Sequence, residues 1–101
     1  MFERKELSRD EVLLTVVGSL TGENVNEFHR QVEELVGESY PTITLDLSGA
    51  SGINSSALGK ILLFRKKLAE AQRTLQIRGC SDTLFKTFQM IKFDSLISIM
   101  K

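Results

Sequence analysis

The sequence predicts a single α/β domain in which helices pack against a mixed, mostly parallel sheet of four to five strands. The length of 101 residues suits one domain and is too short for two. Segments with strand-like and helix-like patterns alternate along the chain, which is typical of parallel sheets. We find no linker, internal repeat or low-complexity tract, so residues 1–101 are treated as one domain.

The N-terminal part is predicted to form two strands. Residues 12–17 are a short apolar run rich in β-branched side chains, and the run ends at Gly18. Charged residues 9–11 precede it as a turn, and residues 2–7 are expected to pair with it as an edge strand. From residue 24 the apolar spacing becomes helical, with Asn24 as the expected N-cap and Gly37 as the stop, and the apolar positions are Val25, Phe28, Val32, Leu35 and Val36.

The middle of the chain is predicted to be strand, loop and long helix. Residues 43–47 form the strand, and residues 48–52 are small and are expected to form a loop. Residues 55–71 have helical apolar spacing that is interrupted at Arg65, and the apolar side chains are Leu58, Ile61, Leu62 and Leu68.

The C-terminal part is predicted to contain a strand over residues 74–78 and a helix over residues 82–91 that Ser81 opens. Leu84, Phe85 and Phe88 are expected to face inward, and Met90 continues their spacing as a core residue. Residues 95–99 are interpreted as a last strand or a frayed helix.

Composition narrows the class of protein. Thirteen basic residues balance thirteen acidic ones, so no overall field attracts nucleic acid or anionic lipid. No apolar run is long enough to insert into a membrane, and the N-terminus lacks a secretory pattern. The single cysteine, Cys80, cannot form an internal disulfide, which favours a reducing cytoplasm.

The segment from residue 45 to residue 59 joins a strand to a helix and is the best candidate for a functional site. Partners and ligands of open α/β sheets usually dock beyond the carboxyl ends of the strands. Asn54 or Ser55 is expected to cap the helix, which places nearby hydroxyls beside unpaired backbone amides and the positive end of the helix dipole. A phosphate on Ser55 would be stabilised there.

This segment resembles the STAS domain family, and within it the anti-sigma factor antagonists. The matching residues are Asp46-Leu47-Ser48-Gly49 and Asn54-Ser55-Ser56-Ala57-Leu58-Gly59, and weaker matches extend over nearly the whole chain. The resemblance implies a cytoplasmic, bacterial phosphoprotein that regulates transcription by partner switching and is a monomer. It implies phosphorylation of Ser55 by an anti-sigma factor that is a serine kinase, and reversal by a PP2C-type phosphatase. The second choice for the modified residue is Ser56, and the expected partner-binding residues are Thr21, Asn54, Ser55, Ser56, Leu58, Gly59 and Leu62.

Two positions depart from the family pattern. Asn54 and Thr21 stand where the family usually has acidic residues, so two carboxylates near the modified serine are absent. Asn54 can still cap a helix. The departures favour an alternative in which the chain is a STAS adaptor that never carries phosphate and serves a larger complex of the lipid-transport or stressosome-like kind.

Catalysis, metal binding and a cofactor are not predicted. Ser55 lacks the Gly-x-Ser-x-Gly pattern of an esterase nucleophile, and the only histidine, His29, lies on another helix. Gly52 and the pair Gly59-Lys60 are separated by six residues, which is too many for a phosphate-binding loop. His29 has no second histidine or cysteine at ligand spacing, and Cys80 is expected to be an ordinary half-buried thiol.

Overall fold

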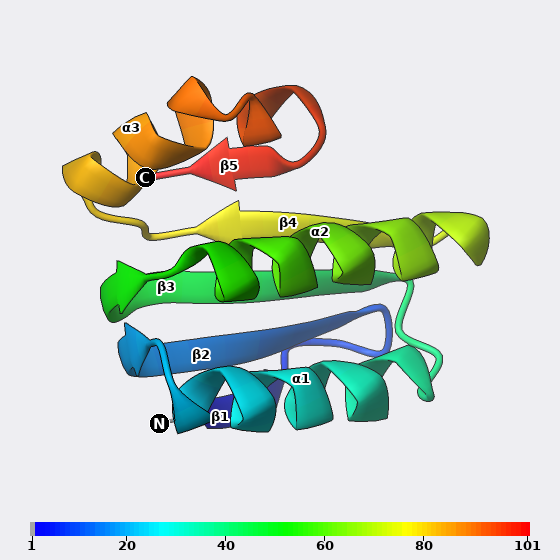
Figure 1. Cartoon of the computed structure of the whole chain (residues 1–101). Helices are drawn as coiled ribbons and strands as arrows, with labels where there is room; N and C mark the ends of the chain where they lie inside the picture. Colours follow the sequence, from blue (N-terminus) through cyan, green and yellow to red (C-terminus); the bar gives the residue numbers. More distant parts are fainter. Residues whose placement is uncertain (1) are drawn as a thin grey trace.

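The computed structural model describes residues 2–101, which form a five-stranded sheet and three α-helices. The strands follow one another across the sheet in chain order, with only β1 antiparallel to its neighbour (Figure 1). The elements are β1 (Phe2–Glu6), β2 (Glu11–Leu20), α1 (Glu23–Val36), β3 (Thr42–Ile53), α2 (Ser55–Glu70), β4 (Thr74–Arg78), α3 (Asp82–Met90), the 3-10 turn η1 (Phe93–Ser95) and β5 (Ser98–Met100). The predicted fold class is confirmed.

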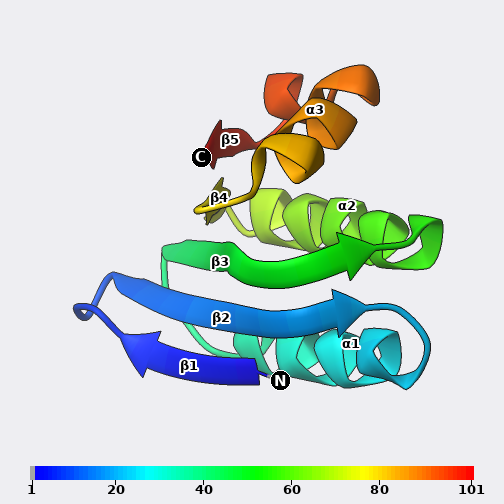
Figure 2. The same ribbon diagram turned by 90° about the vertical axis from the view of Figure 1, so that its left-hand side faces the viewer.

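All three α-helices lie on one face of the sheet (Figure 2). The core fills the space between them, because alternate residues of β2 and β3 and every third or fourth residue of each helix point into it. The fully buried aromatic residues are Phe28, Phe64 and Phe88. Within the described residues, none of the helices is long and apolar enough to cross a membrane.

The start of α1 differs from the sequence expectation. Gly22, not Asn24, is the N-cap, and its φ of 57° lies in the left-handed region that favours glycine. Asn24 lies in the first turn of the helix, where its side-chain amide donates to the carbonyl oxygen of Ser19 at 2.8 Å. The expected N-cap was wrong because a tertiary contact to the end of β2 takes up the Asn24 side chain.

The stretch of small residues after Leu47 is also not a loop. β3 continues to Ile53 and β2 continues past Gly18 to Leu20, with two register shifts between them. Each shift adds a residue to β3, which is how a β-bulge behaves. The close approach needs small residues: a Cβ on Gly49 would lie 3.1 Å from Cγ2 of Val17. The small-residue run therefore allows a bulged strand to continue.

Arg73, just before β4, ties three segments together. Its guanidinium donates to the carbonyl oxygens of Leu35, Val36 and Tyr40 at 2.9, 2.9 and 2.8 Å. The first two lie in the last turn of α1, where carbonyls lack intrahelical donors, and the Leu35 oxygen also accepts from the amide of Glu38 at 3.2 Å. Arg73 therefore closes the end of α1 by a contact from a distant part of the chain.

The C-terminal elements follow the predictions in most respects. Ser81 caps α3 as expected, with its hydroxyl accepting from the amide of Leu84 at 3.2 Å. Phe85 is half-buried, but the expectation that Met90 is core was wrong, since 83% of it is exposed at the last turn of α3. The final segment forms η1 and then the short strand β5.

Candidate functional site

The site predicted from sequence lies at the carboxyl ends of β2 and β3, where α1 and α2 begin (Figure 1). Leu20 and Ile53 are register partners at the ends of these strands. The next residues are Thr21 and Asn54, so the two positions that lack the family's acidic residues are neighbours in space. Their proximity depends on the strand pairing and could not be read from sequence spacing.

Asn54 joins the two strand ends to the start of α2. Its side-chain oxygen accepts from the amide of Ala57 at 2.9 Å, which is an N-cap hydrogen bond. Its own backbone amide donates to the carbonyl oxygen of Leu20 at 3.3 Å. The structure thus selects Asn54, of the two candidates, as the cap and leaves the Ser55 side chain free of that task.

Ser55 and Ser56 occupy the first two helical positions of α2, and both are exposed. Within residues 2–101, neither hydroxyl has a hydrogen-bond partner. The backbone amides of this first turn include some with no intrahelical acceptor, and the turn carries no acidic side chain. The local field therefore favours an anion.

Thr21 belongs to a small polar cluster beside this turn. Its hydroxyl oxygen lies 2.8 Å from that of Ser19, and Asn24 binds the Ser19 backbone. Sequence reasoning found Thr21 but missed Ser19 and Asn24 as its neighbours. Their position immediately after a strand that ends at the carboxyl edge was the signal that could have indicated them.

The remaining predicted partner-binding residues continue along α2. Ser55, Gly59 and Leu62 are spaced by four and three residues and so share one side of the helix. All three are exposed, whereas Leu58 is half-buried against the core. The structure brings these residues into one strip that begins at Ser55.

The Asp46 and Ser48 residues of the family motif have a structural role. One oxygen of the Asp46 carboxylate accepts from the amide and the hydroxyl of Ser48, at 3.0 and 2.7 Å. Both residues lie within β3 and several residues before the site. The family motif therefore has two parts: Asp46 and Ser48 stabilise β3, whereas Ser55 and Ser56 are exposed at the start of α2.

We also looked for metal-binding and reactive side chains in the part of the chain that the structure describes. It contains no group of three histidine, cysteine or acidic residues that could hold a metal ion. His29 is half-buried, with Nε2 3.9 Å from a Glu33 carboxylate oxygen. Cys80 is buried rather than half-buried, and desolvation raises the pKa of its thiol, which lowers its reactivity.

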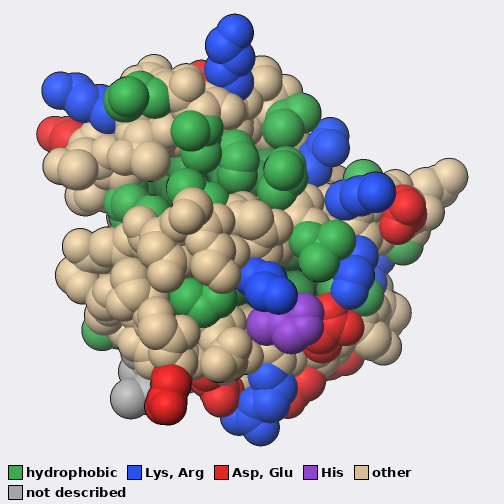
Figure 3. Space-filling view, viewed as in Figure 1, with side chains coloured by type: hydrophobic (Ala, Val, Ile, Leu, Met, Phe, Trp, Pro, Cys, Tyr) green, Lys and Arg blue, Asp and Glu red, His purple; other side chains and the backbone are tan. Residues whose placement is uncertain are grey.

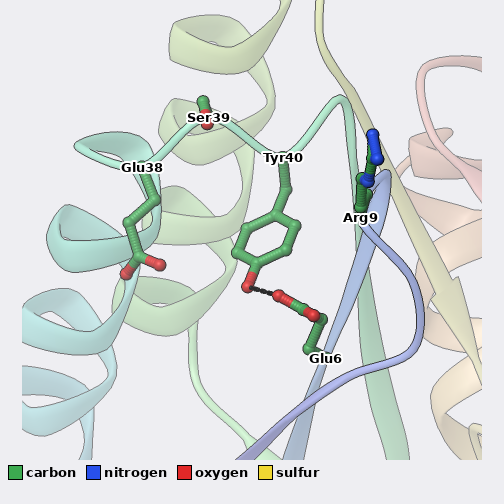
Figure 4. A pocket seen from close by; sticks show the side chains of 5 residues that line it. All are labelled: Glu6, Arg9, Glu38, Ser39 and Tyr40. Carbon is green, nitrogen blue, oxygen red and sulfur yellow. Dashed lines mark hydrogen bonds between the residues drawn. The ribbon is translucent and has the colours of Figure 1, made fainter.

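A surface hollow of about 370 Å³ is lined by Glu6, Arg9, Glu38, Ser39 and Tyr40 (Figure 4). It lies where β2 and β3 begin, at the opposite end of these strands from Ser55. Three of the five lining side chains are already paired: the Tyr40 hydroxyl donates to Glu6 at 2.5 Å, and Glu38 accepts two hydrogen bonds from Arg4. The Glu6 contact raises the pKa of Tyr40. This hollow therefore offers few unpaired groups to a ligand, and we do not place the site there.

The cap makes a direct prediction. Asn54→Ala should lower the free energy of unfolding by about 1 kcal/mol, because the amide of Ala57 loses its acceptor. Asn54→Asp should keep the cap and add a favourable charge at the helix start. Urea denaturation measures both. Asn26→Ala, at an exposed position within α1, is the matched control and should not destabilise. Equal stability of Asn54→Ala and the unchanged protein would contradict the role of Asn54.

Comparison with known families gives a match over almost the whole chain. The sequence model described as "Mlab, STAS domain" matches residues 3–98. No curated protein sequence matches significantly.

Solved structures with the same fold come from several kinds of protein. A candidate anti-sigma factor antagonist from Thermotoga maritima superposes with a TM-score of 0.89 at 24% identity, covering 99% of this chain and 86% of that one. The anti-sigma factor antagonist SpoIIAA in its unphosphorylated form gives 0.83 at 19% identity, with coverages of 100% and 89%. A sulfate transporter family protein from Wolinella succinogenes gives 0.79 at 15% identity, with coverages of 95% and 80%. At these identities the likeness establishes the fold.

Proposed function

This chain belongs to the STAS domain family, and on that premise we propose that it is a switchable binding module, an anti-sigma factor antagonist controlled by phosphorylation of Ser55. The unmodified form binds an anti-sigma factor that is also a serine kinase, and phosphorylation by that kinase releases it. A PP2C-type phosphatase restores the binding form. The module works in the bacterial cytoplasm and is not itself a catalyst.

The observation that carries the proposal is the position of Ser55. Its hydroxyl is exposed at the first position of α2, next to the Asn54 cap but with no structural hydrogen bond of its own. A kinase can reach it without unfolding the chain. A side chain with no role in the fold is free to serve recognition.

The electrostatics of the turn support a switch that leaves the fold intact. A phosphate adds a charge of about −1.5 to −2 and three acceptor oxygens. The N-terminus of a helix stabilises such a group, and the first turn of α2 has no carboxylate to repel it. The same charge would be costly in an interface shaped around a neutral hydroxyl. Binding is therefore lost while stability is kept.

A second candidate is an adaptor that never carries phosphate. The neutral pair Thr21 and Asn54 favours it, because no carboxylate is there to orient or activate the Ser55 hydroxyl. The setting of this candidate is a larger complex of the lipid-transport or stressosome-like kind. In this candidate the surface around Ser55 binds a permanent partner.

Phosphorylation of Ser55 predicts a charge-dependent loss of partner. Intact-mass analysis and fragment mapping of the protein from its own cells should find phosphate on Ser55. The anti-sigma factor should be retained by Ser55→Ala and weakened at least about tenfold by Ser55→Asp, which corresponds to about 1.4 kcal/mol. Because an aspartate at this position suits the helix dipole, thermal unfolding should show Ser55→Asp to be as stable as the unchanged protein.

Ser56→Asp is the matched control, since Ser56 is an exposed serine in the same helical turn. It should bind the anti-sigma factor better than Ser55→Asp does. Phosphate on Ser56 would instead assign the switch to that residue. An unmodified Ser55, with the same partner held by both Ser55 variants, would reject the switch and leave the adaptor.

A further inference from the structure

The charges of this neutral chain are divided between its two halves. Residues 1–46 contain ten of the thirteen acidic and four of the thirteen basic residues, whereas residues 47–101 contain three acidic and nine basic residues. The strand order keeps the halves apart: β1, β2 and α1 lie on one side of β3, and β4, β5 and α3 lie on the other (Figure 1). The α3 side of the molecule is therefore basic, and the α1 side is acidic.

The basic side contains a groove lined by both polar and apolar side chains. Leu58, Leu62, Arg65 and Ala69 follow one another along one side of α2 at helical spacing. Near the end of α2 this strip meets a cavity of about 180 Å³. The cavity is lined by Arg65, Ala69, Arg73, Thr74, Leu75 and Leu96. We call the strip and the cavity the α2–η1 groove.

Large apolar side chains near the groove remain open to solvent. Leu62 is 39% exposed and Leu96 is 44% exposed, and the end of α3 adds Met90 and Ile91. Figure 3 shows hydrophobic side chains gathered over the region of α2 and α3, with lysine and arginine side chains around them. A gathered apolar surface of this kind is typical of a protein contact.

The size of the groove favours a helix over a small molecule. The cavity is smaller than the roughly 300–1,000 Å³ of ligand pockets, so it suits one anchoring side chain. The strip from Leu58 to Ala69 is about 16 Å long, or three helical turns. An amphipathic helix presents apolar anchors at this spacing.

The charges beside the groove indicate the sign of the charge that its partner carries. Five basic residues on α2, α3 and the following turn have no ion pair among residues 2–101: Lys60, Arg65, Lys66, Lys86 and Lys92. The acidic residues of the same elements are Glu70, Asp94 and Asp82, and Asp82 pairs with Lys101 at 3.2 Å. Basic charge is therefore in excess, and an acidic partner is complementary to it.

We propose that the α2–η1 groove binds an acidic amphipathic helix of a partner protein, with one side chain of that helix entering the cavity that Arg65 and Leu96 line. The proposal deepens the partner-binding function and rests on it, because the strip begins at the turn that carries Ser55. Leu58 and Leu62 then contact the apolar face of the helix, and Arg65 pairs with its acidic edge.

The test uses the full chain and a fluorescent peptide of about 14 residues, long enough for about 21 Å of helix. Its leucines are spaced by three and four residues, with glutamates beside them. One comparison peptide has the same composition without an apolar face, and another has lysines in place of the glutamates. The glutamate helix should bind tightest and should weaken as salt is raised. Amide NMR shifts should change mainly in α2 and in residues 90–96.

Variants locate the contact. Arg65→Glu and Leu62→Glu should each weaken the glutamate helix at least about tenfold. Leu7→Glu, at a similarly exposed leucine outside the groove, is the control and should change affinity by less than about twofold.

Three results would overturn the proposal: equal binding of the lysine helix, shifts confined to α1 or to the Ser55 turn, or a groove occupied by a second copy of this chain. Sedimentation would detect the last as a dimer that Leu62→Glu dissociates. Failure of the groove and failure of the switch are separable. If Ser55→Ala binds the anti-sigma factor, Ser55→Asp does not, and the glutamate peptide fails to bind, the phosphorylation switch is supported and the groove is rejected. If the peptide binds but both Ser55 variants bind the anti-sigma factor equally, the groove is supported and the switch is rejected.

Discussion

Phe64→Ala is expected to lower the free energy of unfolding by about 3–5 kcal/mol. Phe64 is fully buried in α2, between the sheet and the helix, in line with Ile61 and Leu68. Truncation removes the transfer free energy of the ring and leaves a cavity that the surrounding core fills only in part. Because a domain of this kind has about 5–15 kcal/mol in total, guanidinium denaturation should show a much earlier midpoint.

Leu63→Ala is the matched control, one position away on the same helix. Leu63 is 40% exposed, so its truncation should cost about 1 kcal/mol or less. Equal losses for the two variants would mean that α2 presents a different face to the sheet. In that case the exposed strip that begins at Ser55 would also be misplaced, so this stability measurement tests the geometry of the site as well.

Gly79→Ala is expected to destabilise the protein by about 2–4 kcal/mol, the sum of a backbone cost and a crowding cost. Gly79 has a φ of 76°, which alanine adopts with strain. A Cβ at this position would also lie 2.8 Å from a carboxylate oxygen of Asp46 and 3.0 Å from Cβ of Ser48. The Asp46–Ser48 hydrogen bonds hold that oxygen in place.

Alanine variants of two other glycines allow the backbone cost to be measured apart from the crowding cost. Gly22 has a φ of 57° but open space around its Cβ position, so Gly22→Ala should carry only the backbone cost of about 1 kcal/mol. Gly59 lies within α2 in open space, and Gly59→Ala should stabilise by about 0.5–1 kcal/mol. Urea denaturation should rank the three variants by free energy of unfolding, with Gly59→Ala the most stable, Gly22→Ala next and Gly79→Ala the least stable. A Gly79 variant no worse than the Gly22 variant would show that Asp46 and Ser48 move aside at little cost.

The helix and strand types were predictable because their signals are local. Apolar spacing identified α1 and α2, and Ser81 was found as the cap of α3 because a serine at that position acts on an amide three residues away. The expected helix start at Asn24 was wrong because the signal that fixes the start of α1 is not local to the helix. Gly22 and the end of β2, which lie outside the periodic pattern, determine where α1 begins.

The candidate site was partly readable for similar reasons. Asn54 and Ser55 are adjacent residues at a strand-to-helix junction, so local sequence predicted a cap at one of them, and the structure selected Asn54. The nearness of Thr21 was implied by family resemblance alone, and the structure explains it by the pairing of Leu20 with Ile53. The α2–η1 groove was missed, because Arg65 and Leu96 are far apart in sequence and meet only when α2 and η1 pack beside β4.

The sequence by itself determined the α/β class, the order of the elements, the helical cap near Ser55 and the membership of the STAS family, because periodicity, capping and motifs act over a few residues. Only the tertiary structure decided that residues 48–52 continue a bulged strand, that Arg73 closes α1, and that the charges separate into an acidic and a basic side. These features depend on which strands pair and which side chains meet across the sheet, and such long-range contacts leave no periodic pattern in the chain.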